Sequence, residues 1–149
     1  MSDAFRIRPA TEADLCRITE VEIFNYRLFF YPIFRNDAFY FEELQVSRRL
    51  DDEGLWPDAF VYDDGAVKGF IRMDGTEVRK LFVEPVLQGQ GIGAALLEYA
   101  IREKGACSLW ALEKNVRAIR FYQRHGFAVT GERKLEDDTE EYLIKMERK

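Results

Sequence analysis

The apolar residues in the first third of the chain recur at helical spacing. Four of them mark one face of a helix predicted over about 12–28: Leu15, Ile18, Val21 and Leu28. A short alternating strand over 5–8 precedes this helix, and a second helix is expected over about 37–49. Pro32 stands between the two helices, where its missing N–H and fixed φ predict a break. The stretch from Phe24 to Phe41 is also unusually rich in aromatic residues.

After residue 58 the pattern changes to the alternation that is typical of strands. Strands are predicted over 59–62, 67–73, 77–83, 107–112 and 140–146, with another beginning at Phe127. Two further helices are predicted, one from the glycines at 89–93 to Gly105 and one over 115–125. This order predicts a mixed α/β domain of the α+β type with about four helices, in which residues 1–149 form a single domain.

Length, charge and cysteines narrow the classes of function. The chain has 149 residues, 47% hydrophobic and 33% charged, which suits a folded domain. Its formal net charge of -5 argues against nucleic acid as a partner, because neutralising phosphates requires a basic surface. No apolar run reaches the roughly 20 residues of a membrane span, and the first residues lack a signal-peptide pattern. We therefore expect a cytoplasmic protein without a metal or membrane partner, with Cys16 and Cys107 as reduced core thiols.

The segment after the predicted strand over 77–83 carries the most informative motif. It reads Gln88-Gly89-Gln90-Gly91-Ile92-Gly93-Ala94 and opens a helix. Free N–H groups at a helix N-terminus, together with the helix dipole, form a site suited to a pyrophosphate. A dinucleotide-binding fingerprint needs the spacing G-x-G-x-x-G, and a P-loop needs a lysine after the last glycine. Neither is present, and a plain flexible turn is the alternative to an anion site.

Two motifs together resemble the GNAT superfamily of N-acetyltransferases. The segment Gln88–Gly93 is similar to that family's Q/R-x-x-G-x-G/A signature, and the segment Asn115–Phe127 is similar to its N-x-x-A-x-x-F-Y-x-x-x-G-F pattern. The order of elements agrees over nearly the whole chain. The resemblance implies the GNAT fold, a mixed and mostly antiparallel sheet that splays between its fourth and fifth strands to admit acetyl-CoA.

The resemblance also implies which residues hold acetyl-CoA. The backbone from Gln88 to Ala94 would bind the pyrophosphate, and the backbone of Phe82 and Val83 would pair with the pantetheine arm. Asn115 matches an asparagine that contacts the cofactor in the family. The implied cofactor-binding set is Phe82, Val83, Gln88, Gly89, Gln90, Gly91, Ile92, Gly93, Ala94 and Asn115.

Three residues are candidates for proton transfer. Tyr122 matches the tyrosine that the family commonly uses to protonate the departing thiolate, and an unperturbed phenol, with a pKa near ~10, is protonated at neutral pH. The alternative for Tyr122 is an ordinary half-buried aromatic residue. Glu77 lies eleven positions before Gln88, where histone-type members have their general base, or else it is a solvated strand residue. Glu22 competes with Glu77, either as the base or as an anchor for a cationic amine.

The last predicted helix carries two further polar features. A basic stripe on one face, formed by Arg117, Arg120 and Arg124, is either solvated or close enough to bind the 3′-phosphate of CoA. His125 is the only histidine, and we expect it at the surface where this helix ends.

The acceptor site is expected to come from the first helix and the aromatic stretch. The candidates for substrate binding are Glu22, Asn25, Tyr26 and Tyr31. Most rings of the aromatic stretch would serve equally well as core, and the surplus of carboxylates favours a cationic acceptor.

These residues predict an N-acetyltransferase that moves an acetyl group from acetyl-CoA, its co-substrate, to a primary amine by direct transfer in a ternary complex. The acceptor is a small-molecule amine or a peptide amine. A non-catalytic acetyl-CoA-binding regulatory module is the alternative. The sequence leaves the oligomeric state open, a homodimer included.

Overall fold

A curved sheet of seven strands forms the centre of the molecule in the computed structural model, which describes residues 4–53 and 57–149. The strands are β1 (Ile7–Pro9), β2 (Ala59–Asp63), β3 (Val67–Asp74), β4 (Glu77–Val83), β5 (Ser108–Leu112), β6 (Phe127–Leu135) and β7 (Tyr142–Arg148). Their order in the sheet is β1-β2-β3-β4-β5-β7-β6, and only the β4–β5 pair is parallel. The prediction of a mixed, mostly antiparallel sheet is confirmed.

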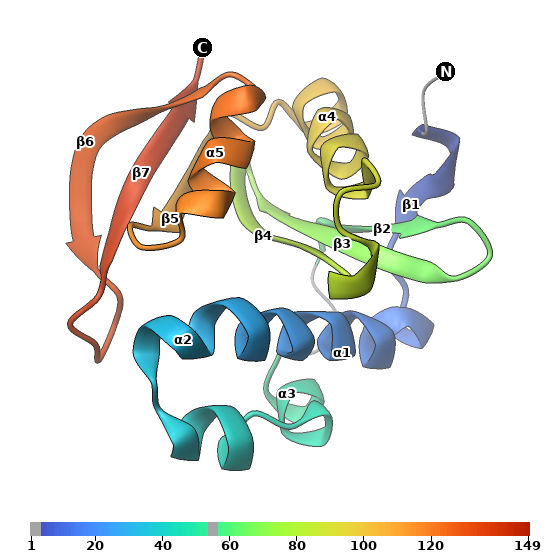
Figure 1. The fold of residues 1–149 in the computed structure, drawn as a ribbon. Helices are drawn as coiled ribbons and strands as arrows, with labels where there is room; N and C mark the ends of the chain where they lie inside the picture. The colour runs from blue at the N-terminus through green and yellow to red at the C-terminus, as the bar shows by residue number, and fades with distance from the viewer. Residues whose placement is uncertain (1–3, 54–56) are drawn as a thin grey trace.

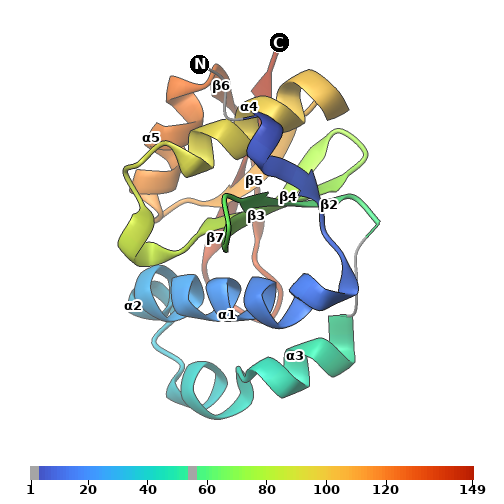
Figure 2. The same cartoon turned by 90° about the vertical axis from the view of Figure 1, so that its right-hand side faces the viewer.

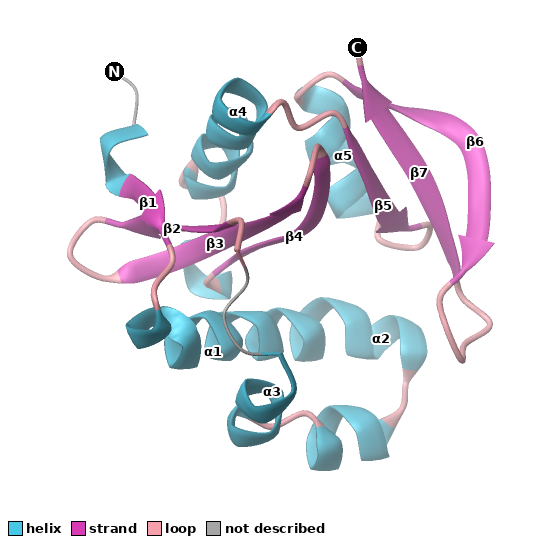
Figure 3. Cartoon of the chain, turned by 180° about the vertical axis from the view of Figure 1, so that it is seen from behind, coloured by secondary structure: helices cyan, strands magenta, loops and turns pink. Residues whose placement is uncertain are grey.

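Helices cover both faces of this sheet (Figures 1 and 2). They are α1 (Leu15–Asn25), α2 (Tyr31–Phe34), α3 (Val46–Glu53), α4 (Ile92–Lys104) and α5 (Val116–Arg124). The first three lie on one face and the last two on the other (Figure 3). Leu96 and Leu97 of α4 are fully buried against the sheet, and each contributes roughly 1.5–3 kcal/mol to stability through the burial of its side chain.

The helical layer below the sheet differs from its prediction at Pro32. A π-helical segment, Tyr26–Phe30, joins α1 to α2 without a break, and the helix ends only at Arg35, which has a left-handed φ of 54°. Pro32 lies in α2, directly after the π-helical segment, and the helix continues through it to Phe34 although its ring supplies no N–H. The prediction of a helix break at this residue is therefore wrong.

The helix predicted over 37–49 is divided in two. A second π-helical segment, Ala38–Glu43, is separated from α3 by Leu44, whose φ of -80° and ψ of 87° are not helical. The described residues therefore contain five α-helices, against about four predicted.

The sheet splays between β4 and β5, as the family resemblance implies. Only Glu77 and Val78 of β4 pair with β5, opposite Ser108 and Leu109. From Arg79 onward β4 pairs with β3 alone, so its other edge is open.

The two cysteines are free, but they are not core residues. Cys16 is exposed on α1, immediately after Leu15, and Cys107 is partly buried just before β5. Cys16 stands beside the apolar stripe rather than on it, so the prediction of two core thiols is wrong. Within the described residues, no helix is long and apolar enough to cross a membrane.

Candidate active site

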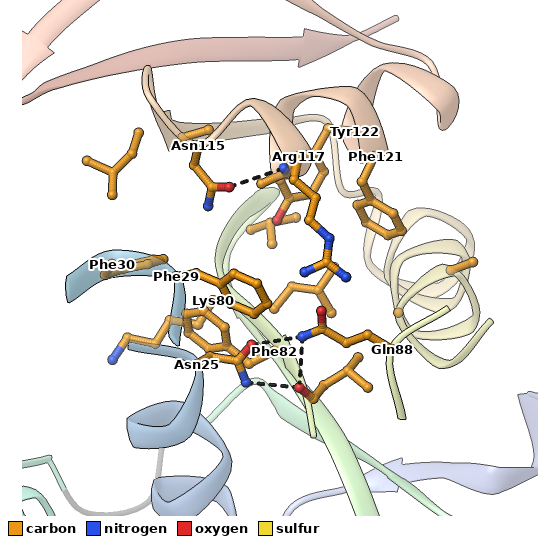
Figure 4. A pocket seen from close by; sticks show the side chains of 18 of the residues that line it. Asn25, Phe29, Phe30, Lys80, Phe82, Gln88, Asn115, Arg117, Phe121 and Tyr122 are labelled. Carbon is orange, nitrogen blue, oxygen red and sulfur yellow. Dashed lines mark hydrogen bonds between the residues drawn. The ribbon is translucent and has the colours of Figure 1, made fainter. Parts of the chain in front are cut away.

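A cavity of about 710 Å³ lies at the splay between β4 and β5 (Figure 4). The open edge of β4 and the N-terminus of α4 line one part of it, and α5 covers it from above. The π-helical segment Tyr26–Phe30 and strands β5 and β7 line the rest. Segments that lie far apart in the sequence therefore meet around one cavity.

The N-terminus of α4 presents free backbone N–H groups at one end of the cavity. Gly89 and Gly91 have left-handed φ values of 86° and 85°, and a Cβ added at either would meet no atom within 4 Å. Gly91 is the N-cap residue, and its carbonyl accepts the first helical hydrogen bond, from the Ala95 N–H, at 3.0 Å. The N–H groups of residues 92–94 are thus left without helical partners beside open space, which suits a phosphate group.

Asn25 ties α1, the end of β4 and the glycine loop together. Its side chain is buried, and its Nδ2 donates to the carbonyls of Val21 at 2.8 Å and Val83 at 2.9 Å. Its Oδ1 accepts from Nε2 of Gln88 at 3.0 Å, and this nitrogen also donates to the Val83 carbonyl at 3.3 Å (Figure 4). Asn25 also lines the cavity. Because its amide oxygen and nitrogen both bond within the protein, Asn25 holds the loop in place, and its role in binding the substrate stays a prediction.

The strand register decides which backbone groups face the splay. The Glu84 N–H donates to the Lys68 carbonyl at 2.9 Å. In an antiparallel pair, alternate residues point their backbone groups at the partner strand, so Phe82 directs its N–H and C=O toward β3. Leu81 and Val83 direct theirs toward the cavity. Of the two predicted residues only Val83 presents its backbone there, and Leu81, which alternation along the strand could have indicated, was missed.

Tyr122 reaches the cavity from α5. Its ring packs against Phe121 and Phe127, with ring centroids 5.3 and 6.0 Å apart. Burial raises the pKa of its phenol above the usual value, so the hydroxyl stays protonated at neutral pH. Among the residues that the structure describes, none hydrogen-bonds to this hydroxyl, which leaves it available as a donor. At the start of the same helix, Asn115 lines the cavity and its Oδ1 accepts from the Ala118 N–H at 3.3 Å.

Comparisons with known proteins agree with this geometry. A sequence profile for the acetyltransferase (GNAT) domain matches residues 56–129. The peptidyl-lysine N-acetyltransferase YjaB of Salmonella typhimurium is 36% identical over 96 residues, which are 64% of each chain. An N-acetyltransferase of Archaeoglobus fulgidus is 34% identical over 135 residues, which are 78% of this chain and 88% of the relative. The chain belongs to the GNAT acetyltransferase family.

The fold of this GNAT domain is shared with a solved structure of the family. The apo form of YjaB from Escherichia coli superposes with a TM-score of 0.77, at 23% identity, over 95% of both chains. The sequence match of the chain to the YjaB proteins spans 64% and 61% of their lengths.

The GNAT cofactor residues predicted from the sequence mostly gather at the α4 end of the cavity. The cavity lining includes nine of them: Phe82, Val83, Gln88, Gly89, Gly91, Ile92, Gly93, Ala94 and Asn115. Gln90 is exposed and does not line it. Two of the three arginines of the basic stripe, Arg117 and Arg124, line the same cavity. His125 also lines it and packs on Phe121 at 4.8 Å. It caps the C-terminus of α5, where the sequence predicted the helix to end, and its side chain is only partly exposed.

The acceptor wall of the GNAT site is only partly the predicted one. Tyr26 lines the cavity, and so do Phe29 and Phe30, which no individual prediction named. Tyr31 does not, because the next residue along a helix points about 100° away. Its ring packs on Tyr40 at 5.8 Å, and its hydroxyl bonds to Asp37, which raises the pKa of the phenol.

Neither predicted GNAT carboxylate lines the cavity. Glu22 is buried on α1, where it pairs with Arg49 and with Lys80, whose Nζ lies 3.0 Å away. Glu77 lies at the start of β4, and its carboxylate pairs with Arg79 at 3.0 Å. Both charges are therefore balanced by neighbouring cations of the protein itself. The lining contains one carboxylate, Glu136, in the turn between β6 and β7.

Proposed function

We propose that this protein is an acetyl-CoA-dependent N-acetyltransferase that acetylates a primary alkyl amine, with the lysine side chain as its first candidate acceptor. One observation carries the proposal: the open edge of β4, the free N–H groups of α4 and the free Tyr122 hydroxyl converge on a single cavity. Membership of the GNAT family supports the reaction, and the YjaB relative, a peptidyl-lysine N-acetyltransferase, supports the acceptor.

Different residues of the chain carry out different parts of the reaction. Acetyl-CoA supplies the acetyl group as a thioester. The N–H groups of residues 92–94 bind its pyrophosphate, and those of Leu81 and Val83 face the splay, where they can bond to the pantetheine arm or polarise the thioester carbonyl. As the new C–N bond forms and the C–S bond breaks, Tyr122 donates its proton to the thiolate. Tyr122 regains a proton from solvent, and the surplus proton of the amine leaves to solvent.

The amine attacks the thioester directly in this scheme. An alternative route would pass the acetyl group through a cysteine thiolate. Cys16 and Cys107 both lie outside the cavity lining, which supports direct transfer in a ternary complex.

A Tyr122→Phe variant tests the acid role. We expect kcat to fall about 100-fold, the lower range for loss of a general acid. Stability and the dissociation constant of CoA should stay near the wild-type values, because the hydroxyl has no partner among the described residues. Release of free thiol from acetyl-CoA is the measurement, with Nα-acetyl-lysine amide as the acceptor. Tyr99→Phe, on α4 against Phe60 and outside the cavity lining, is the matched control.

Two outcomes would contradict the proposal. If Tyr122→Phe keeps the wild-type rate and pH profile, Tyr122 is not the acid. If the wild-type protein binds acetyl-CoA but releases no thiol with lysine peptides, polyamines or arylamines, the chain is a binding module rather than an enzyme.

A further inference from the structure

The cavity lining includes charged side chains of both signs, among them Arg79 and Lys80 of β4. Arg117 and Arg124 of α5 line it, with their guanidinium groups over the rings of Phe29 at 4.7 Å and Phe121 at 6.0 Å. Within the described chain neither arginine forms an ion pair. Glu136, in the turn between β6 and β7, lines the same cavity with the opposite charge.

Glu136 is held at the cavity by its backbone. Its N–H donates to the Glu141 carbonyl at 2.8 Å, and its own carbonyl accepts from the Thr139 N–H at 3.1 Å and the Thr139 hydroxyl at 2.8 Å. The side chain is partly buried. These bonds fix the backbone of the turn, from which the Glu136 side chain reaches the cavity.

The surroundings of Glu136 form the wall opposite the aromatic helix segment. Trp110 and Leu143, on the neighbouring strands β5 and β7, line the cavity with it, and Tyr26 and Phe30 line it from the helical layer. The turn extends toward the α2 end of that layer (Figures 1 and 3). After burial, the charge of Glu136 is the second cause that raises the pKa of Tyr40 in this layer.

The Glu136 carboxylate differs from the other charges near this end. The Lys80 ammonium pairs with Glu22, and the Arg79 guanidinium pairs with Glu77. The Glu136 carboxylate forms no ion pair and accepts no hydrogen bond from any residue that the structure describes. A partly buried carboxylate gains most from a cation that the protein itself does not supply.

We infer that Glu136 is a specificity-determining residue that binds the positive charge of the acceptor amine. This inference rests on the proposed function. An alkyl ammonium would enter between the aromatic side chains of the two walls, with its charge on Glu136 and its methylene groups against the rings. It would release one proton to solvent before its nitrogen attacks the thioester. Lysine side chains and free alkyl diamines share this chemistry, whereas an arylamine is uncharged at neutral pH.

Glu136→Gln tests the inference, with Asp137→Asn as the matched control. Asp137 is the next residue, is exposed and does not line the cavity, so its variant removes the same charge from the same turn. We expect Glu136→Gln to lower kcat/KM at least about tenfold for Nα-acetyl-lysine amide, mostly through KM. An arylamine should lose less than about twofold, and Asp137→Asn should resemble the wild type with both acceptors. A lysyl peptide and 1,4-diaminobutane are compared in parallel to separate the two sources of the ammonium.

A binding measurement keeps the inference separate from the proposed function. Calorimetric titration of Nα-acetyl-lysine amide into the CoA complex, where no acetyl group can transfer, should show the same tenfold loss for Glu136→Gln. Added salt should weaken the amine's affinity for wild type more than for this variant. Equal losses with arylamine and lysine acceptors, or unchanged binding in Glu136→Gln, would overturn the role of Glu136 while leaving the transferase proposal intact. A wild-type protein that binds the amine but never acetylates it would instead refute the proposed function.

Discussion

The shape of the cofactor end depends on a single buried amide, Asn25. Its partners are the carbonyl of Val83, 58 residues away along the chain, and the side chain of Gln88, 63 residues away. A buried carbonyl that loses its donor keeps the full cost of its desolvation. Asn25 therefore sets both the stability of this corner and the position of the glycine loop.

An Asn25→Leu variant should lose about 1–3 kcal/mol of unfolding free energy, because it removes two buried donors at once. Gln88→Ala removes one bond of the same network and should cost about 0.5–1.5 kcal/mol. The affinity for acetyl-CoA should fall in both variants, because the glycine loop loses hydrogen bonds that hold it in place. Urea unfolding and calorimetric titration measure the two effects. An Asn25→Leu variant as stable as the wild type would show that water replaces the lost donors.

The buried phenol of Tyr40 makes the free energy of unfolding decrease at alkaline pH. Burial, and then the charge of Glu136, raise its pKa to about 12, above the value near ~10 in an unfolded chain. Its contribution to stability is therefore complete below pH ~10 and is lost as the pH rises through about 12. The buried Tyr122 phenol acts with the same sign.

Replacement of Tyr40 by Phe should flatten the decline in stability over this alkaline range. Urea midpoints followed by circular dichroism, at a pH near 8 and again near 11, measure the slope. Glu136→Gln should flatten it to a smaller degree, because the charge of Glu136 is the second cause of the raised pKa. A Tyr40→Phe variant with the wild-type slope would show that this phenol does not control the transition.

The roles of single residues could be predicted where a local motif carries them. Tyr122 and the glycine loop belong to short contiguous patterns, and the cavity brings both together. The bonds of Asn25 and Glu22 within the protein could not be predicted, because their partners come from distant segments that no local pattern reveals. Glu136 was not predicted as a site residue, since nothing in the spacing shows which side of the sheet a turn approaches.

At the scale of elements, one of the two π-helical segments lines the cavity. Such segments are rare and often occur at functional sites. In Tyr26–Phe30 the segment carries three cavity residues, at positions 26, 29 and 30. Helical periodicity predicted a helix here, but it could not separate the π from the α form, because both repeat apolar residues at three to four positions. The proline rule then placed a break where the helix continues through Pro32.

The glycine turn that opens α4 provides a test at the same scale. Gly91→Ala places a Cβ at a φ of 85° in open space, so we expect backbone strain of about 1–2 kcal/mol without a steric clash in the free protein. Gly75→Ala, in the β3–β4 turn, creates a similar strain at a φ of 60°, also in open space. Thermal unfolding should show comparable losses for both variants.

The two glycine variants should differ in ligand binding. Gly91 lines the cavity and Gly75 does not. An added Cβ at Gly91 would obstruct a phosphate group approaching the backbone. We expect the affinity for acetyl-CoA to fall at least about tenfold in Gly91→Ala and to stay unchanged in Gly75→Ala. Equal affinities in the two variants would place the pyrophosphate elsewhere.

At the scale of the whole molecule, the order of elements was predictable and the opening of the sheet was not. Alternation and turn residues predicted seven strands, and all seven are present. The splay was expected only through the family resemblance, because it depends on where β5 stops pairing with β4. That point follows from the packing of α4 on β2, β3 and β4 and of α5 on β6, which one strand's sequence does not encode.

The short β4–β5 joint has a consequence for the native-state fluctuations of the protein. In the sheet, two residue pairs connect the ladder of β1–β4 with the ladder of β5–β7, and one buried core cluster, which includes Val78 and Met146, spans both. Each half has its own ladder, so each is a candidate unit for partial opening, with its own protection against amide hydrogen exchange. A ligand that contacts both halves would stabilise the closed state of each, so its binding would couple their opening equilibria. The opening rate of the β5–β7 unit would then respond to the concentration of acetyl-CoA around the protein.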